Sequence, residues 1–286
     1  MGLTLFDFAP GRRVDDRFEI GTSQRQGGMF AAFDIIDLSN GEPRELQVFP
    51  SGIFETPAQS RDFATELDGW RAVTAPRVLR VHEVIARGDF VLLLTDRPRG
   101  PSLRSWLAGR KRLDVDVAVA LGCDALEGLE AIHANGLVHG DVKPFTIHVE
   151  EVHGAPRAML VDGGITKGLW TAKHLGEKTA LIGTPVYAPV EQFGGDSPNA
   201  QSDIYNVATV LFELIAGAVP WPGSSFLEVF QAKLAPAVPT IRQRAPDIKV
   251  PTAVEEAILD GLRSDARERW ATAREFRSAL QAALED

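Results

Sequence analysis

Short runs of alternating hydrophobic and polar residues fill most of the first hundred positions of the chain. Five of them have the length and composition of β-strands, with glycine, proline, asparagine or aspartate between them, at residues 17–21, 29–37, 45–49, 81–85 and 90–95. One stretch, at about residues 58–73, carries its apolar residues at helical spacing instead. The pattern predicts a small β-rich unit that contains a single helix.

After Gly100 the apolar residues recur every three or four positions. This spacing predicts helices at residues 102–107, 115–133, 203–216, 226–234, 253–262 and 273–284. Thr272 and Glu275 form the sequence pattern of a capping box at the start of the last helix. The second part of the chain is therefore predicted to be larger and mainly helical.

Composition narrows the class of protein. The chain has 286 residues, 44% of them hydrophobic, which is enough for one large domain or two lobes with cores of their own. A net charge of -9 argues against nucleic acid or an anionic membrane as the main partner. The apolar runs are too short to span a bilayer, and the single cysteine, Cys123, excludes an internal disulfide. We expect a cytoplasmic protein that does not insert into membranes.

Five motifs follow one another between residues 137 and 270. They are LVHGDVKPFTIHV at 137–149, MLVDGG at 159–164, GTPVYAPVEQ at 183–192, SDIYNVATVLFELIAGAVPW at 202–221 and SDARERW at 264–270. In this order and spacing the sequence resembles a bacterial Hanks-type (eukaryotic-like) Ser/Thr protein kinase domain. The resemblance implies an α+β, bilobal protein-kinase-like fold. It places an N-terminal extension at residues 1–11, a small β-rich N-lobe at 12–96 and a larger α-helical C-lobe at 97–286.

The catalytic loop matches the family only in part. The resemblance assigns Asp141 to the aspartate that orients the substrate hydroxyl, Lys143 to its companion lysine and Asp162 to the metal-binding carboxylate. Gly140 stands where many members have arginine, and Thr146 replaces the magnesium-binding asparagine. Because a threonine hydroxyl is a shorter and weaker ligand than an amide carbonyl, the second metal position is expected to be compromised.

The phosphate-binding part of the N-lobe departs further from the family. Of the three loop glycines only Gly27 remains, followed by Gly28, and Phe30 occupies the last glycine position. Gln47 replaces the phosphate-gripping lysine, and no lysine occurs before Lys111. An arginine such as Arg25, at the first glycine position, could reach the site with its different geometry. Glu66 matches the helix glutamate that normally pairs with the lysine, or is simply an exposed carboxylate.

The predicted adenine pocket is also unusual. Strand alternation places Glu45 and Gln47 on the same face of the sheet, with Glu45 where the family has a small alanine. Ala32 replaces a valine, His148 replaces an aliphatic residue, and Thr95 ends the last strand of the N-lobe. A carboxylate there must stay solvated or find a partner. This indicates a degenerate ATP pocket.

The structural motifs match the family well. Asp203 corresponds to the aspartate that binds the amides of the catalytic loop, and Glu191 and Arg269 correspond to the pair that ties the activation segment to the C-lobe. We interpret these three residues as architectural.

These observations favour a pseudokinase, which is an interaction or allosteric module without enzymatic activity, for which no cofactor is expected. Its partner would be a protein, such as an active kinase or its substrate. The alternative is a divergent active Ser/Thr kinase that binds ATP and Mg²⁺ in an unusual way and uses Asp141, Asp162 and Lys143. A third hypothesis is other nucleotide chemistry, including nucleotidyl transfer, on the same scaffold. Residues 165–181, with three lysines and several apolar residues, are either a docking site or an activation segment ordered by the C-lobe.

Overall fold

The computed structural model describes residues 4–87, 90–175, 184–223, 225–235 and 237–285. The chain divides into two compact units. The first comprises Met1–Thr74, Leu79–Pro98 and Gly168–His174, and the second comprises Ala75–Val78, Arg99–Lys167 and Leu175–Asp286.

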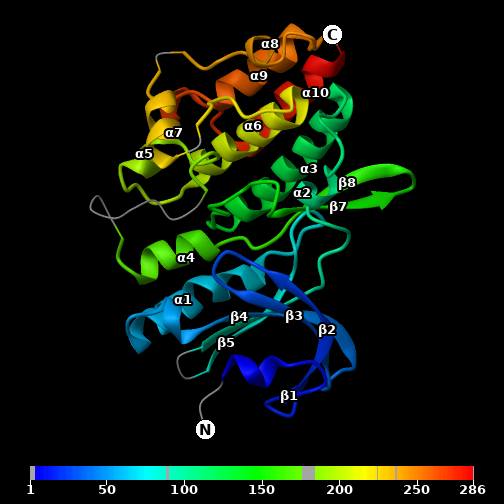
Figure 1. Cartoon of the computed structure of the whole chain (residues 1–286), viewed down its shortest axis with the longest axis vertical. Coiled ribbons are helices and arrows are strands. Elements are labelled where there is room, and N and C mark those ends of the chain that lie inside the picture. Colours follow the sequence, from blue (N-terminus) through cyan, green and yellow to red (C-terminus); the bar gives the residue numbers. More distant parts are fainter. Residues whose placement is uncertain (1–3, 88–89, 176–183, 224, 236, 286) are drawn as a thin grey trace. The chain divides into compact units, whose positions relative to one another are not determined.

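A six-stranded antiparallel sheet forms most of the first unit (Figure 1). Its strands are β1 (Arg13–Val14), β2 (Phe18–Gln26), β3 (Ala31–Asp37), β4 (Glu42–Phe49), β5 (Val81–Arg87) and β6 (Phe90–Thr95), in the spatial order β1-β2-β3-β4-β6-β5. The sequence pattern ended the first long strand at residue 21, but β2 continues to Gln26. Arg25 therefore lies within a strand, paired with Ala32, and not in a loop.

The two faces of this sheet differ in chemistry. Leu46 and Val48 of β4 are buried in an apolar core with Phe8 of the 3₁₀ helix Leu5–Phe8, whose ring lies 5.4 Å from that of Phe33. The opposite face, here called the Glu45 face, carries the polar residues of β2, β3, β4 and β6. Cross-strand pairing places these residues together: Arg25, Ala32, Asp34, Glu45, Gln47 and Thr95.

Helix α1 (Pro57–Asp68) begins where the Thr56 hydroxyl accepts a hydrogen bond from the Gln59 amide. Its buried residue Phe63 lies 5.0 Å from Phe49 of β4, centroid to centroid. The predicted helix extended to residue 73, but α1 ends at Asp68 and the tighter 3₁₀ turn Gly69–Ala72 follows it.

Helices dominate the second unit. They are α2 (Leu103–Trp106), α3 (Val115–Ala134), α5 (Val190–Phe193), α6 (Ala200–Ala216), α7 (Phe226–Lys233), α8 (Ile241–Arg244), α9 (Thr252–Gly261) and α10 (Ala273–Glu285), with a 3₁₀ turn at Ala266–Glu268. Helix α3 packs against α6 and α10 (Figure 1). The contact of α3 with α6 is close, because a Cβ on Gly122 would lie only 2.5 Å from a methyl group of Leu211.

A β-hairpin that the hydrophobic pattern did not predict lies between two of the motifs. Its strands β7 (Ile147–Val152) and β8 (Ala155–Leu160) form a separate ribbon beside α2 and α3 (Figure 1). The connection is the dipeptide His153-Gly154, and both residues have positive φ, at 51° and 80°. Two residues with positive φ are typical of the hairpin turn whose twist matches that of the strands.

Helix α4 (Ile165–Ala172) follows the second motif, and the boundary between the units falls within it, after Lys167. Its residue Gly168 lies against α1, where an added Cβ would be 3.1 Å from the ring of Phe63. Leu169 and Ala172 are fully buried. The part of residues 165–181 that is described, up to residue 175, thus packs against the protein, whereas Lys178 and Leu181 lie outside the described residues.

In the part of the chain that the structure describes, no helix combines the length and the apolar character needed to cross a membrane.

Candidate active site

Asp203 organises the catalytic loop from the first turn of α6. Its carboxylate accepts hydrogen bonds from the amides of His139 at 2.9 Å and Gly140 at 2.8 Å, and Oδ2 also lies 2.9 Å from Nε2 of His133. Gly140 has a φ of 83°, a conformation that favours glycine, and its amide is directed at Asp203. A buried carboxylate with several donors is a strong anchor, so these bonds fix the loop that carries Asp141.

His139 links this loop to the strand that leads to Asp162. Its ring is fully buried, with Nε2 3.0 Å from the carbonyl oxygen of Val161 and Nδ1 3.3 Å from the amide of Asp141. Burial lowers the pKa of His139, which favours the neutral ring with the proton on Nε2. Neutral His139 can then donate to Val161 and accept from Asp141 at the same time.

Lys143 connects Asp141 to the end of the activation segment. Its Nζ lies 2.5 Å from Oδ2 of Asp141 and 2.8 Å from Oγ1 of Thr184. The Asp141 and Lys143 side chains are both about one fifth exposed, so water and a substrate can reach them. The arrangement presents a carboxylate beside a cation and a hydroxyl group.

The metal positions assigned from the sequence differ in what they can offer. The hydroxyl of Thr146 donates to the Asp141 carbonyl at 2.8 Å and accepts from the Lys143 amide at 3.1 Å, so it closes the loop on itself. Asp162 is partly exposed and has a φ of 60°, a backbone conformation that aspartate tolerates better than most residues. Two residues later, the amide of Gly164 donates a hydrogen bond to the carbonyl of His139 at 3.0 Å. Of the two, Asp162 has a partly exposed carboxylate, whereas the Thr146 hydroxyl is bonded within the loop.

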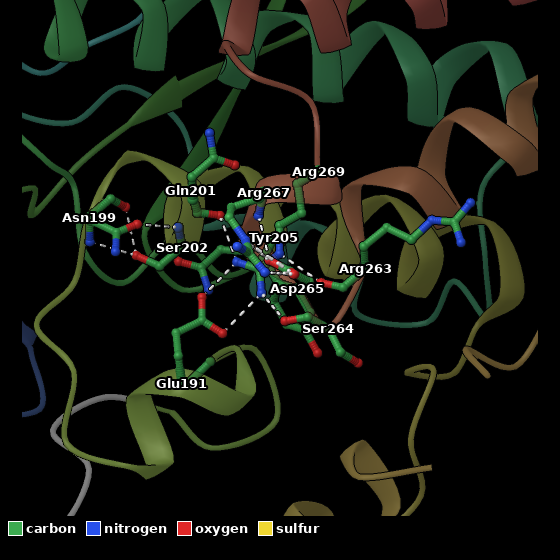
Figure 2. Close-up of polar contacts among 12 residues, drawn as sticks. Glu191, Asn199, Gln201, Ser202, Tyr205, Arg263, Ser264, Asp265, Arg267 and Arg269 are labelled. Atoms are coloured by element: carbon green, nitrogen blue, oxygen red, sulfur yellow. Dashed lines mark hydrogen bonds and ion pairs between the residues drawn. The ribbon is translucent and has the colours of Figure 1, made fainter. Parts of the chain in front are cut away.

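The Glu191–Arg269 pair stabilises the C-terminal side of the activation segment (Figure 2). Nη1 and Nη2 of Arg269 bind the two carboxylate oxygens of Glu191 at 2.7 and 2.9 Å. The same guanidinium donates to the carbonyl groups of Gln201, Arg263 and Ser264 and stacks over the ring of Tyr205 at 4.9 Å. Every donor of this buried cation is directed at an acceptor, so the structure brings together the two residues that the sequence paired.

On the Glu45 face of the sheet in the first unit, Arg25 binds Glu45. Nη2 lies 2.6 Å from Oε1 and Nε 3.2 Å from Oε2, and Nε2 of Gln47 donates to the same carboxylate at 3.2 Å. Glu45 is only 3% exposed and Gln47 is fully buried. The position of the expected lysine is thus occupied by a neutral amide, but a guanidinium stands on the same face, two strands away.

The turn before β3 brings an aromatic ring next to this cation. Gly27 donates its amide to the carbonyl of Phe30 at 3.0 Å, which closes the turn, and a Cβ on Gly27 would collide with the Phe30 ring. That ring lies 5.4 Å from the Arg25 guanidinium and 5.2 Å from Phe49. Gly28 has open space around its Cα. The turn is therefore packed against the sheet by Phe30.

Of the remaining residues of the predicted pocket, Ala32, Glu66 and Thr95 belong to the first unit and His148 belongs to the second. Ala32 and Thr95 are buried on the Glu45 face, and Oγ1 of Thr95 has no hydrogen-bond partner among the described residues. Glu66 is exposed on α1. His148 lies in β7 of the second unit, where Nδ1 is 3.0 Å from the carbonyl of Gly100.

Known proteins match this chain over most of its length. The family model described as "Protein kinase domain" matches residues 53–281. The chain belongs to the protein kinase family. The matched range begins after β4, so Arg25, Glu45 and Gln47 precede it.

Relatives of this kinase domain include the Serine/threonine-protein kinase PkaB of Streptomyces coelicolor, which is 37% identical over 166 residues, covering 56% of this chain and 40% of the relative. The Serine/threonine-protein kinase PknB of Mycobacterium leprae is 26% identical over 272 residues, covering 93% and 43%. The chain thus spans about two fifths of the length of these relatives. The crystal structure of the Mycobacterium tuberculosis PknI kinase domain has the same fold, with a TM-score of 0.74, 20% identity and coverage of 96% of this chain and 99% of that one.

These findings overturn the expectation that the chain is not an enzyme. Its family is that of protein kinase domains, and both sequence relatives are named as Ser/Thr kinases. The expectation rested on the missing lysine, the replacement of a metal-binding asparagine by Thr146 and the altered glycine loop. For the first of these, the residue at one strand position does not determine the charge on the whole face of the sheet. Arg25 restores a cation to the face on which Gln47 lies.

Sequence reasoning missed two features of this kinase domain. It noted Arg25 but did not pair it with Glu45, although the cross-strand register of β2, β3 and β4 was the signal that could have shown it. It also gave no role to Lys233, which is 2% exposed in the second unit, and a lone lysine at the end of a predicted helix offers no signal for such burial.

Proposed function

We propose that this domain is a divergent Ser/Thr protein kinase, which transfers a phosphoryl group from ATP to a hydroxyl group of a protein substrate. The observation that carries the proposal is the contact of Lys143 with both Asp141 and Thr184, at 2.5 and 2.8 Å. It keeps a carboxylate accessible next to a cation within a loop that Asp203 anchors.

The Glu45 face supports nucleotide binding of an atypical kind. Arg25 offers the guanidinium that suits phosphate oxygens, and Glu45 orients it as a carboxylate orients a lysine in other kinases. The buried hydroxyl of Thr95, on the same face, lacks a hydrogen-bond partner among the described residues and fits a polar edge of a base. These features fit ATP bound with an arginine at its phosphates.

The side chains at the two predicted metal positions fit one Mg²⁺ ion and not two. Magnesium in kinases is held by one or two carboxylates together with substrate phosphate oxygens, and Asp162 supplies a carboxylate. Thr146 does not fit a second metal, since its hydroxyl is bonded within the loop. Among the described residues, no cluster of three or more His, Cys, Asp or Glu side chains could hold a metal by itself. The nucleotide must therefore provide most of the ligands.

In this mechanism the residues of the catalytic loop act on the substrate hydroxyl. Asp141 accepts a hydrogen bond from the serine or threonine hydroxyl and takes its proton as the oxygen attacks the γ-phosphorus of ATP, whose bond to the bridging oxygen breaks so that ADP leaves. Lys143, beside Asp141, stabilises the negative charge that develops on the transferred group. Bound Mg²⁺-ATP supplies the phosphoryl group and neutralises part of its charge. Asp203 and His139 hold the loop still while these events occur.

The direct test measures transfer of the labelled γ-phosphate from ATP to the domain itself and to a generic basic protein, with Mg²⁺ or Mn²⁺. We expect slow transfer that Asp141→Asn and Asp162→Asn each abolish. Asp116→Asn, an exposed residue of α3, serves as the matched control and should transfer as the native domain does. Absence of transfer at millimolar ATP with both metals, in protein that is folded by circular dichroism, would contradict the proposed function.

A further inference from the structure

Lys233, the last residue of α7, is buried in an aromatic cage in the second unit. Its Nζ lies 4.8 Å from the ring centroids of both Tyr205 and Trp221 and 6.0 Å from that of Phe193. Tyr205 and Trp221 stack on each other at 5.8 Å. Aromatic faces attract a cation, so the cage favours the charged ammonium form of this lysine.

Three acceptors complete the site. Nζ donates to the carbonyl oxygens of Val186 at 3.0 Å and Ala188 at 2.7 Å and to the hydroxyl of Tyr205 at 3.1 Å. An ammonium group has three protons, and here each has an acceptor. A neutral amine has two protons and a lone pair, so it can donate to both carbonyl groups and accept from the Tyr205 hydroxyl, but its bonds to the carbonyl groups are weaker than those of a charged donor.

The two carbonyl groups belong to a short segment that reaches the catalytic loop. Tyr187 and Ala188 donate their amides to the carbonyl of Thr184 at 2.9 and 3.2 Å, and Asn206 donates to the Tyr187 carbonyl at 2.8 Å. Thr184 in turn binds Lys143 through its hydroxyl. One continuous chain of contacts thus runs from Lys233 through this segment to Lys143 and Asp141.

We propose that protonated Lys233 is a positioning residue for phosphoryl transfer, which holds the Val186–Ala188 backbone so that Thr184 keeps Lys143 and Asp141 in contact. Its link to catalysis rests on the proposed function, whereas the positioning itself does not. The proposal makes the catalytic loop sensitive to protonation at a residue that does not touch the substrate.

The charged groups around Lys233 determine when it loses its proton. Burial lowers the pKa of Lys233 to about 7, the Glu191 carboxylate opposes this change and the Arg269 guanidinium adds to it. The Tyr205 hydroxyl remains neutral, since burial raises its pKa well above the usual value. Loss of the proton therefore occurs near neutral pH, and transfer activity should fall as the pH rises through that range.

Stability should change with pH in the opposite direction. The unfolded lysine keeps its proton up to about pH 10, so between pH 7 and 10 the unfolded state binds one more proton than the folded state. The free energy of unfolding contributed by Lys233 then rises with pH while activity falls. A residue that only supported the fold would move both quantities together.

The test compares the native domain, Lys233→Met and the matched control Lys249→Met, whose lysine is exposed in the same unit. Transfer rates from pH 6 to 9 and hydrogen-exchange protection of the Tyr187 and Ala188 amides are measured on all three. In the native and control proteins we expect both quantities to fall about tenfold across this range. In Lys233→Met we expect low values at pH 6 and no such fall. Urea unfolding should give a stability difference between native and variant protein that increases with pH.

Each outcome decides the matter. A pH-dependent loss of amide protection that persists unchanged in Lys233→Met, or protection that does not vary with pH in the native domain, overturns the proposal whether or not the domain transfers phosphate. If protection responds as expected but no pH gives transfer, the positioning by Lys233 stands and the proposed function fails.

Discussion

The Arg25 guanidinium binds both oxygens of the Glu45 carboxylate, at 2.6 and 3.2 Å, on a face of the sheet where only 3% of Glu45 is exposed. Arg25 comes from β2 and Glu45 from β4, with Ala32 of β3 between them. The small side chain at position 32 leaves room for the long arginine. A cation and a carboxylate are thus held together on the side of the sheet that carries Gln47.

Arg25→Gln should lower phosphoryl transfer by roughly 10²–10³-fold, because it removes a charged donor and leaves the buried Glu45 carboxylate without its partner. Arg25→Lys should lose less, since it keeps the charge but not the two-point contact. Steady-state rates and the KM for ATP provide the measurement. Arg13→Gln, which removes an arginine at the exposed pair with Glu19, is the control and should leave both unchanged. If Arg25→Gln retained native kinetics, Arg25 would not bind the phosphates of ATP.

Asp203→Ala should lower the free energy of unfolding by about 3–5 kcal/mol, because the buried amides of His139 and Gly140 lose their acceptor. Urea unfolding followed by tryptophan fluorescence measures the loss. Asp116→Ala, an exposed substitution, should stay within about 0.5 kcal/mol of the native domain. A similarly small effect of Asp203→Ala would mean that the catalytic loop does not depend on this anchor.

The Glu191–Arg269 pair should show strong coupling in a double-mutant cycle. Arg269→Met alone strands the Glu191 carboxylate and removes the guanidinium donor from the carbonyl groups of Gln201, Arg263 and Ser264. We expect a loss of roughly 3–5 kcal/mol, of which Glu191→Gln in the same chain restores a part. Chemical unfolding of the two single variants and the double variant checks this. Additive losses would show that the two side chains act independently.

The Arg17–Asp37 pair should make the first unit sensitive to acid. The hydrogen bonds from the Arg17 guanidinium hold the pKa of Asp37 well below its usual value, and hydrogen bonds from Ser39 lower it further. Its contribution to stability is therefore complete above about pH 5 and is lost as the pH falls below the ordinary range of aspartate. Thermal unfolding at pH 6, 4 and 3 should show a steeper decline for the native domain than for Asp37→Asn. Parallel declines of the two proteins would contradict this assignment.

Cys123, on α3, should be unreactive at neutral pH. Burial raises the pKa of its thiol to about 11, which leaves almost none of it as the reactive thiolate. A colorimetric thiol reagent should react with the native domain far more slowly than with the urea-unfolded chain at pH 7.5. Equal rates in the two states would show that the thiol is accessible.

Much of the fold could be predicted from periodicity. The predicted helices at residues 115–133, 226–234, 253–262 and 273–284 agree with α3, α7, α9 and α10 to within one residue at each end. Three of them, α3, α9 and α10, have ten or more residues and bury several apolar side chains, whereas α7 is short and buries only Val229 and Lys233. The β7–β8 hairpin was missed because its strands are short and overlap the ends of two motifs that were interpreted for their chemistry. Helix α4 was missed because it lies in the stretch treated as an activation segment.

By itself, the sequence determined the family, most strands of the first unit and the longer helices of the second, because these depend on local spacing and on motifs in fixed order. Only the tertiary structure decided the charge on the Glu45 face and the burial of Lys233. Arg25 reaches Glu45 through the register of three strands, and Lys233 meets Val186, Tyr205 and Trp221 from distant parts of the chain. Such contacts depend on how strands and helices pack, and no local pattern of residues specifies that packing.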